Sequence, residues 1–142
     1  MASPVRSGGG AVTLFAGTIT TAGTVLGTAT GFGGCTWAGL QQAFVYGSSG
    51  GTVNSYVQTS FDGGSSWFDV AASQFTNASA TRVYAVGVGP TAGTASTTPT
   101  DGALTVNTTN PGFIGDRFRV KVVSTGTYAG TTTITVSAVA KG

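Results

Sequence analysis

The chain has 142 residues, of which six are Lys or Arg and four are Asp, with neither Glu nor His and a single Cys. A typical soluble domain is about one-quarter charged, whereas this chain is 7% charged. Without His or Glu, and with one Cys, the usual general bases, zinc sites and Cys–His nucleophiles cannot be assembled. The composition therefore argues against an enzyme and against a metal or cofactor site.

Length and charge also bound the architecture and the partners. A chain of this length predicts one domain with its own core. The net charge of +2 is weak, and no Lys/Arg cluster resembles a nucleic-acid footprint. No window of about 20 predominantly apolar residues predicts a membrane span. We expect neither nucleic acid nor a membrane as a partner.

Gly and Thr dominate the first 34 residues, and no charge lies between Arg6 and Asp62. Residues 1–10 are typical of a flexible arm. Residues 17–34 mix Thr, which favours strands, with Gly, which weakens them. We therefore expect residues 1–34 to be an extended or flexible N-terminal arm or first-strand region, and residues 35–142 to be the folded domain.

The remainder divides into short alternating segments separated by Gly- and Ser-rich turns. The expected strands cover residues 40–46, 52–61, 67–70, 82–88, 117–123 and 131–140, and residues 90–102 are expected to form a surface loop. The count is about eight strands, each with one apolar and one polar face. This pattern predicts an all-β fold, a single antiparallel β-sandwich of jelly-roll-like type.

The sharpest local motif contains Ser60, Asp62, Gly64, Ser66 and Trp67. It resembles the Asp-box hairpin of sialidase-type β-propellers, with Ser66 in place of Thr. An Asp side chain can accept hydrogen bonds from turn N–H groups, Gly permits positive φ, and Trp can pack back on the hairpin. Because the motif occurs once, without a blade-length repeat, we expect a structural role for this hairpin.

Arg117, Arg119 and Lys121 lie two residues apart on one predicted strand, so they project from one face. They could form a solvated or edge-guarding face. Alternatively, they could dock onto an acidic protein surface or a phosphate backbone, and they are our interface candidates. The aromatic residues, Trp37 and Trp67 among them, leave a similar choice between strand packing and a sugar-binding platform.

Two stretches, residues 56–70 and 115–128, are similar to the small Gly/Thr-rich β-sandwich virion proteins of tailed bacteriophages. The resemblance implies a non-enzymatic virion component, a decoration or cement protein bound to the major capsid protein. It also implies a homo-oligomer, with a trimer as the common geometry. A head–tail connector or tail protein is an alternative, as is a carbohydrate-binding or adhesin module. Few charges suit burial in an assembly, and we expect residues 1–34 to be the main intersubunit segment.

Overall fold

The computed structural model describes residues 10–32, 35–87, 97–110 and 112–142. These ranges contain no helix, and so no helical segment that could cross a membrane. The strands are β1 (Val12–Thr18), β2 (Gly23–Leu26), β3 (Thr30–Gly31), β4 (Trp37–Val45), β5 (Ser48–Ser49), β6 (Val53–Ser60), β7 (Phe68–Phe75), β8 (Ala80–Gly87), β9 (Thr108–Thr109), β10 (Arg117–Ser124), β11 (Tyr128–Ala129) and β12 (Thr133–Lys141).

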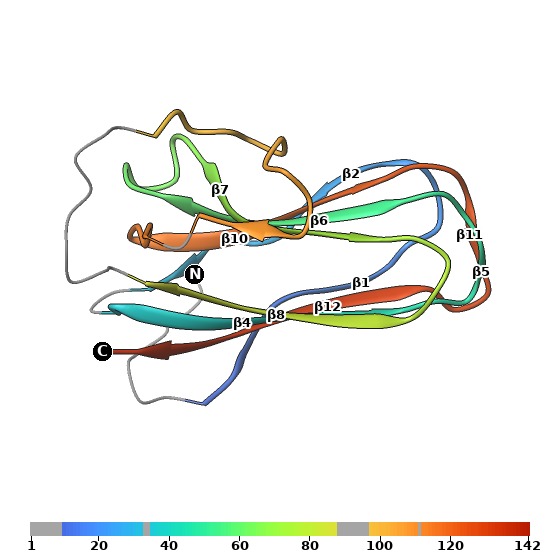
Figure 1. The fold of residues 1–142 in the computed structure, drawn as a ribbon, viewed down its shortest axis with the longest axis horizontal. Helices are drawn as coiled ribbons and strands as arrows, with labels where there is room; N and C mark the ends of the chain where they lie inside the picture. The colour runs from blue at the N-terminus through green and yellow to red at the C-terminus, as the bar shows by residue number, and fades with distance from the viewer. Residues whose placement is uncertain (1–9, 33–34, 88–96, 111) are drawn as a thin grey trace.

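Two antiparallel sheets pack face to face (Figure 1). The four-stranded sheet has the order β1-β12-β4-β8, and the six-stranded sheet has the order β2-β10-β6-β7-β9, with β3 beside β10. Eight strands have four or more residues, and they pair from the outside of the sequence inward. β1 pairs with β12, β2 with β10, β4 with β8, and β6 with β7. This nested pairing is the winding of a jelly roll. The predicted all-β sandwich is confirmed.

The core lies between the sheets, and strand alternation explains it. In β10 and β12 every second residue is buried, from Phe118 to Ser124 and from Ile134 to Ala140. Phe44 and Phe75 connect the sheets, with stacked rings whose centroids are 5.1 Å apart. Apolar side chains on the inner faces and polar ones outside are the arrangement expected of a sandwich.

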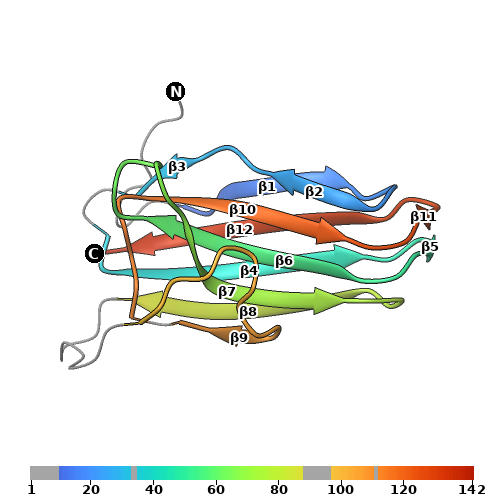
Figure 2. The same ribbon diagram turned by 90° about the horizontal axis from the view of Figure 1, so that it is seen from above.

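The outer face of the six-stranded sheet is partly covered. Every residue of β6 from Ser55 to Ser60 is buried, which a strand with one solvated face would not show. We call residues 97–110 the strap, because this segment lies against β7 and across that outer face (Figures 1 and 2). The loop expected at residues 90–102 thus falls partly in the strap, and residues 88–96 lie outside the described ranges.

The Gly/Thr-rich N-terminal region is built into both sheets. β1 pairs with β12, while β2 and β3 pair with β10. A bulge between Thr13 and Phe15 leaves Leu14 buried in the core, and Ile19 is buried as well. Residues 12–31 therefore belong to the sandwich rather than to an arm separate from residues 35–142. Residues 1–9 and 33–34 of the expected arm lie outside the described ranges.

Candidate functional site

The hairpin between β6 and β7 has the local bonds that the motif requires. The Ser60 hydroxyl accepts a hydrogen bond from the Gly64 N–H at 2.8 Å and donates to Asp62 Oδ1 at 2.9 Å. Asp62 accepts from the Ser66 N–H at 2.9 Å and from the Ser66 hydroxyl at 2.6 Å. The Trp67 indole N–H donates to the Gly64 carbonyl at 3.1 Å. The five residues therefore close the hairpin on itself.

These bonds also change the acidity of Asp62. The hydroxyl and N–H of Ser66, followed by the Ser60 hydroxyl, lower the pKa of Asp62 from 3.8 to about 2. Hydrogen bonds to the charged form favour it. The carboxylate is thus held ionised as a turn acceptor, which is the opposite of what a general acid requires.

The cationic strand lies directly beside this hairpin. Arg117, Arg119 and Lys121 all project from the outer face of β10, while Phe118 and Val120 between them are buried. The Arg119 guanidinium carbon lies 4.5 Å from the centroid of the Trp67 ring, a cation–π contact. The hairpin and the three cations were separate features in the sequence analysis. In the structure they lie side by side on the outer face of the six-stranded sheet.

The strap covers two of the three cations. The Asp101 carboxylate accepts from Lys121 Nζ at 3.0 Å and from the Gln58 amide at 2.7 Å, and its distance to the Arg119 guanidinium is 3.9 Å. The Arg119 and Lys121 side chains are 15% and 20% exposed, whereas that of Arg117 is 39% exposed. The hydrogen bond from Gln58, and then the charges of Lys121 and Arg119, lower the pKa of Asp101. Arg117 is consequently the member of the three most accessible to a partner.

Asp69 anchors the strap from below. This residue is fully buried on β7, and its carboxylate accepts from the Thr100 hydroxyl at 2.8 Å and from the Gln58 amide at 2.9 Å. Consecutive backbone N–H groups, those of residues 102–104, also donate to it at 2.9–3.0 Å. A buried charge is tolerated where hydrogen bonds satisfy it. From the sequence, Asp69 falls in the expected strand 67–70 and Asp101 in the expected loop 90–102, and no signal indicates that Gln58 joins them.

Three of the four Asp residues hold backbone segments in place: Asp62 holds the hairpin, and Asp69 and Asp101 hold the strap. In the described part of the chain, no three His, Cys, Asp or Glu residues gather as metal ligands would. All four Asp residues and the three cations of β10 belong to the six-stranded sheet or to its loops. The described charges outside this sheet are Arg82 on β8 and Lys141 on β12.

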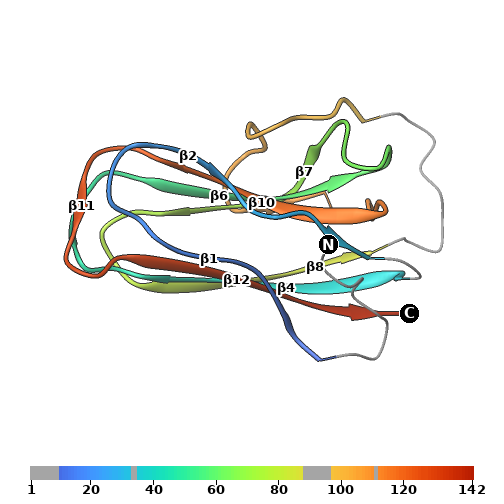
Figure 3. The same ribbon diagram turned by 180° about the vertical axis from the view of Figure 1, so that it is seen from behind.

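We call the side of the sandwich formed by residues 10–32 the N-terminal side (Figure 3). It is free of charged residues. Val25 and Leu26 on β2 are 50% and 53% exposed. Because successive side chains point to opposite faces of a strand, exposure of both means that the described residues cover neither face of β2. A groove of about 420 Å³ runs alongside, lined by Leu14, Phe15 and Leu26 among others.

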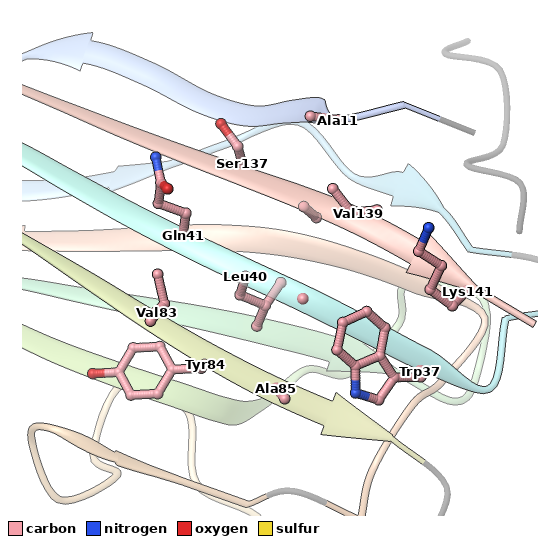
Figure 4. A pocket seen from close by; sticks show the side chains of 12 residues that line it. Ala11, Trp37, Leu40, Gln41, Val83, Tyr84, Ala85, Ser137, Val139 and Lys141 are labelled. Atoms are coloured by element: carbon pink, nitrogen blue, oxygen red, sulfur yellow. The ribbon is translucent and has the colours of Figure 1, made fainter. Parts of the chain in front are cut away.

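A larger groove, of about 710 Å³, lies on the outer face of the four-stranded sheet (Figure 4). Trp37, Gln41 and Val83 contribute to its lining, together with Ser137 and Lys141 of β12. Trp37 and Val83 are 41% and 72% exposed. Of the two uses considered for Trp37, core packing and a binding surface, the structure thus places its side chain on the surface.

Comparison with known proteins adds no relative to these observations. No protein-family model matches the chain. No curated protein matches it either.

Proposed function

We propose that the protein is a non-enzymatic structural component of a tailed-phage virion, a decoration or cement protein docked on the major capsid shell. The observation that carries the proposal is the uncharged N-terminal side, with Val25 and Leu26 half-exposed beside a groove. A neutral surface can be buried without the desolvation cost of unpaired ions. The resemblance of residues 56–70 and 115–128 to phage virion proteins, drawn from the sequence alone, supplies the identity of the proposed partner.

The edge strands on this side indicate how docking would occur. Edges of natural sheets are commonly guarded by charges, by bulges or by shortness. β1 has a bulge and β2 is four residues long, but neither strand carries a charge. The bulge and the short length disfavour open-ended strand addition, while the neutral side chains favour contact with a preformed surface. We therefore expect side chains rather than added strands to make the interface.

The jelly-roll winding is compatible with this role without assigning it. Jelly rolls form viral capsid domains and lectin domains alike, and a fold does not determine a function. As a homo-oligomer, a trimer by analogy with common shell decoration, the protein would present several copies of the N-terminal side to the shell. Repetition of a modest contact raises the total affinity.

The test mixes the purified protein with empty shells of the major capsid protein encoded in the same genome and measures co-sedimentation. We expect the wild-type protein to bind and the double variant Val25→Asp/Leu26→Asp to bind at least about tenfold more weakly, because both new carboxylates would lose water on docking. Of the two, the carboxylate at residue 26 would lie opposite Lys121 of β10, whereas the one at residue 25 would lie opposite Val122 and have no described cation beside it. Val83→Asp is the matched control, since Val83 is exposed on β8 at the opposite edge. Thermal unfolding establishes that each variant is folded.

Failure of the wild-type protein to sediment with shells would overturn the proposal. Binding to purified tails or connectors instead would select the alternative virion role. Arg117→Glu asks whether the cationic strand contributes a second contact: if it faces an acidic partner, docking weakens, and the weakening is smaller at high salt.

A further inference from the structure

The groove on the four-stranded sheet is built from three rows of side chains, set by strand register. One row contains Ser137, Gln41 and Val83, the next Val139, Gly39 and Ala85, and the third Lys141, Trp37 and Gly87. Rows two residues apart along a strand are separated by about 6.6 Å. The row of Ser137, Gln41 and Val83 therefore lies about 13 Å from the row of Trp37. The row of Val139, Gly39 and Ala85 forms the floor between them.

Trp37 lies against this floor. A Cβ atom built on Gly39 would be 3.1 Å from Cη2 of the indole, and one built on Gly87 would be 3.3 Å from Cδ1. The two glycines thus let the ring approach the sheet closely, and Figure 4 shows the ring spread over β4 rather than standing upright. One face of the indole is turned to the sheet, and 41% of the residue remains exposed.

We propose that this groove binds a short neutral oligosaccharide, with a sugar ring stacked on Trp37. An aromatic face is a good surface for the apolar face of a pyranose ring. The Gln41 amide and the Ser137 hydroxyl can exchange hydrogen bonds with sugar hydroxyls, and Lys141 can donate from the far end of the groove. None of these three side chains has a hydrogen-bond partner among the described residues.

The charge and shape of the groove favour a neutral sugar over a protein partner. Among the described residues that line it, Lys141 is the one charged side chain and none is an acid. Aromatic anchors of protein interfaces usually insert into pockets of the partner, whereas this indole lies along the sheet. Ala11 is the one lining residue that belongs to the N-terminal side, whereas Trp37, Gln41 and Ser137 lie on β4 and β12. The proposal therefore does not depend on the proposed virion role.

The test screens wild-type protein on an array of neutral oligosaccharides and measures the strongest binder by isothermal titration calorimetry. Trp37→Ala should weaken binding by at least about tenfold, and Gln41→Ala should weaken it by a smaller factor. Phe61→Ala is the control, since Phe61 is an aromatic residue 58% exposed outside the groove, and it should bind as wild type does. If Trp37→Ala is unfolded, Trp37→Phe, with its smaller ring, should show an intermediate affinity.

Three results would overturn the proposal. The first is no binding of any neutral oligosaccharide at millimolar concentration. The second is equal affinity in the wild-type protein and in the folded Trp37 and Gln41 variants. The third is a wild-type dimer, measured by analytical ultracentrifugation, that Trp37→Ala converts to a monomer, because a second copy would then occupy the groove.

Discussion

Asp69 shows how a single residue organises a surface of this protein. Its carboxylate is fully buried, yet it accepts hydrogen bonds from a hydroxyl, from an amide and from three successive backbone N–H groups. Each donor that Asp69 satisfies belongs either to β6 or to the strap. A buried carboxylate without these bonds would be costly. With them, the Asp69 carboxylate connects the strap to the six-stranded sheet.

Asp69→Asn should lower the free energy of unfolding by about 3 kcal/mol, because the amide group would oppose N–H donors with donors of its own. Urea denaturation measures the change. Asp116→Asn is the matched control: the Asp116 side chain is 46% exposed and pairs with Arg117 at 3.2 Å, a surface pair for which we expect a loss of at most about 1 kcal/mol. Equal losses in the two variants would contradict the anchoring role.

Asp62 carries a second prediction, which concerns pH. Its folded-state pKa of about 2 lies below the ordinary value of 3.8, so its bonds stabilise the fold above about pH 4, and this contribution is lost as the pH falls toward 2. NMR titration of the Asp62 carboxyl should give a pKa near 2 in the wild-type protein. In Ser66→Ala it should rise toward 3.8, because the largest contribution to the shift comes from the Ser66 hydroxyl. A wild-type pKa near 3.8 would refute the hydrogen-bonded hairpin.

At the scale of elements, the strap depends on the close approach of its backbone at Gly102 to the Lys121 side chain. Gly102 has φ of +81°, and a Cβ atom there would be 3.1 Å from Cε and Nζ of Lys121. Positive φ is readily adopted by glycine and costly for other residues. Glycine at this position thus lets the strap turn while Asp101 reaches Lys121.

Gly102→Ala should therefore destabilise the protein by about 1 kcal/mol or more, and it should speed hydrogen exchange of the Ala103 and Leu104 amides. Gly112→Ala is the control, since none of the described residues beyond its chain neighbours has an atom within 4 Å of a Cβ built there, and its effect should be within about 0.5 kcal/mol. Unchanged amide exchange in Gly102→Ala would show that the strap is held by other contacts.

The elements also show what the sequence can and cannot predict. Strands with strict alternation, such as β10 and β12, were predicted within about two residues, because one face of each is buried. β2 was not predicted as a strand of the sandwich, because its residues are all exposed and its pairing with β10 joins segments about 100 residues apart. The Asp62 hairpin is local and its bonds were predictable. The pairing of Asp101 with Arg119 and Lys121 was not predictable, because it depends on the position of the strap, and the strap has the composition of an ordinary loop.

At the scale of the whole molecule, charge is divided between the sheets. The ion pairs of Asp101 with Lys121 and Arg119, together with the buried Asp69 carboxylate, hold the strap on the six-stranded sheet, while the N-terminal side and most of the four-stranded sheet are neutral. The low charge content is therefore unevenly distributed, and the neutral surfaces are the ones on which both proposals rest.

Deletion of residues 1–31 should abolish cooperative unfolding, because it removes β1, β2 and β3 together with the buried Leu14 and Ile19. Differential scanning calorimetry measures the transition. The full-length Val25→Asp/Leu26→Asp variant, by contrast, should keep it, since both side chains are half-exposed. A cooperative transition in the deleted protein would show that residues 32–142 fold without these strands. Docking is accordingly better tested by point variants than by truncation.

The antiparallel pairing of β1 with β12 has a mechanical consequence. Val12 lies opposite Ala138 and Thr18 opposite Thr133, so the start of β1 and the last part of β12 lie at the same end of the sandwich. Tension between these two points pulls along the inter-strand hydrogen bonds, which run perpendicular to the strands. The pairs then separate one after another from Val12 onward instead of sharing the load. The sandwich should therefore resist force less well when it is pulled between the start of β1 and the end of β12 than when it is held through a sheet surface away from these two points.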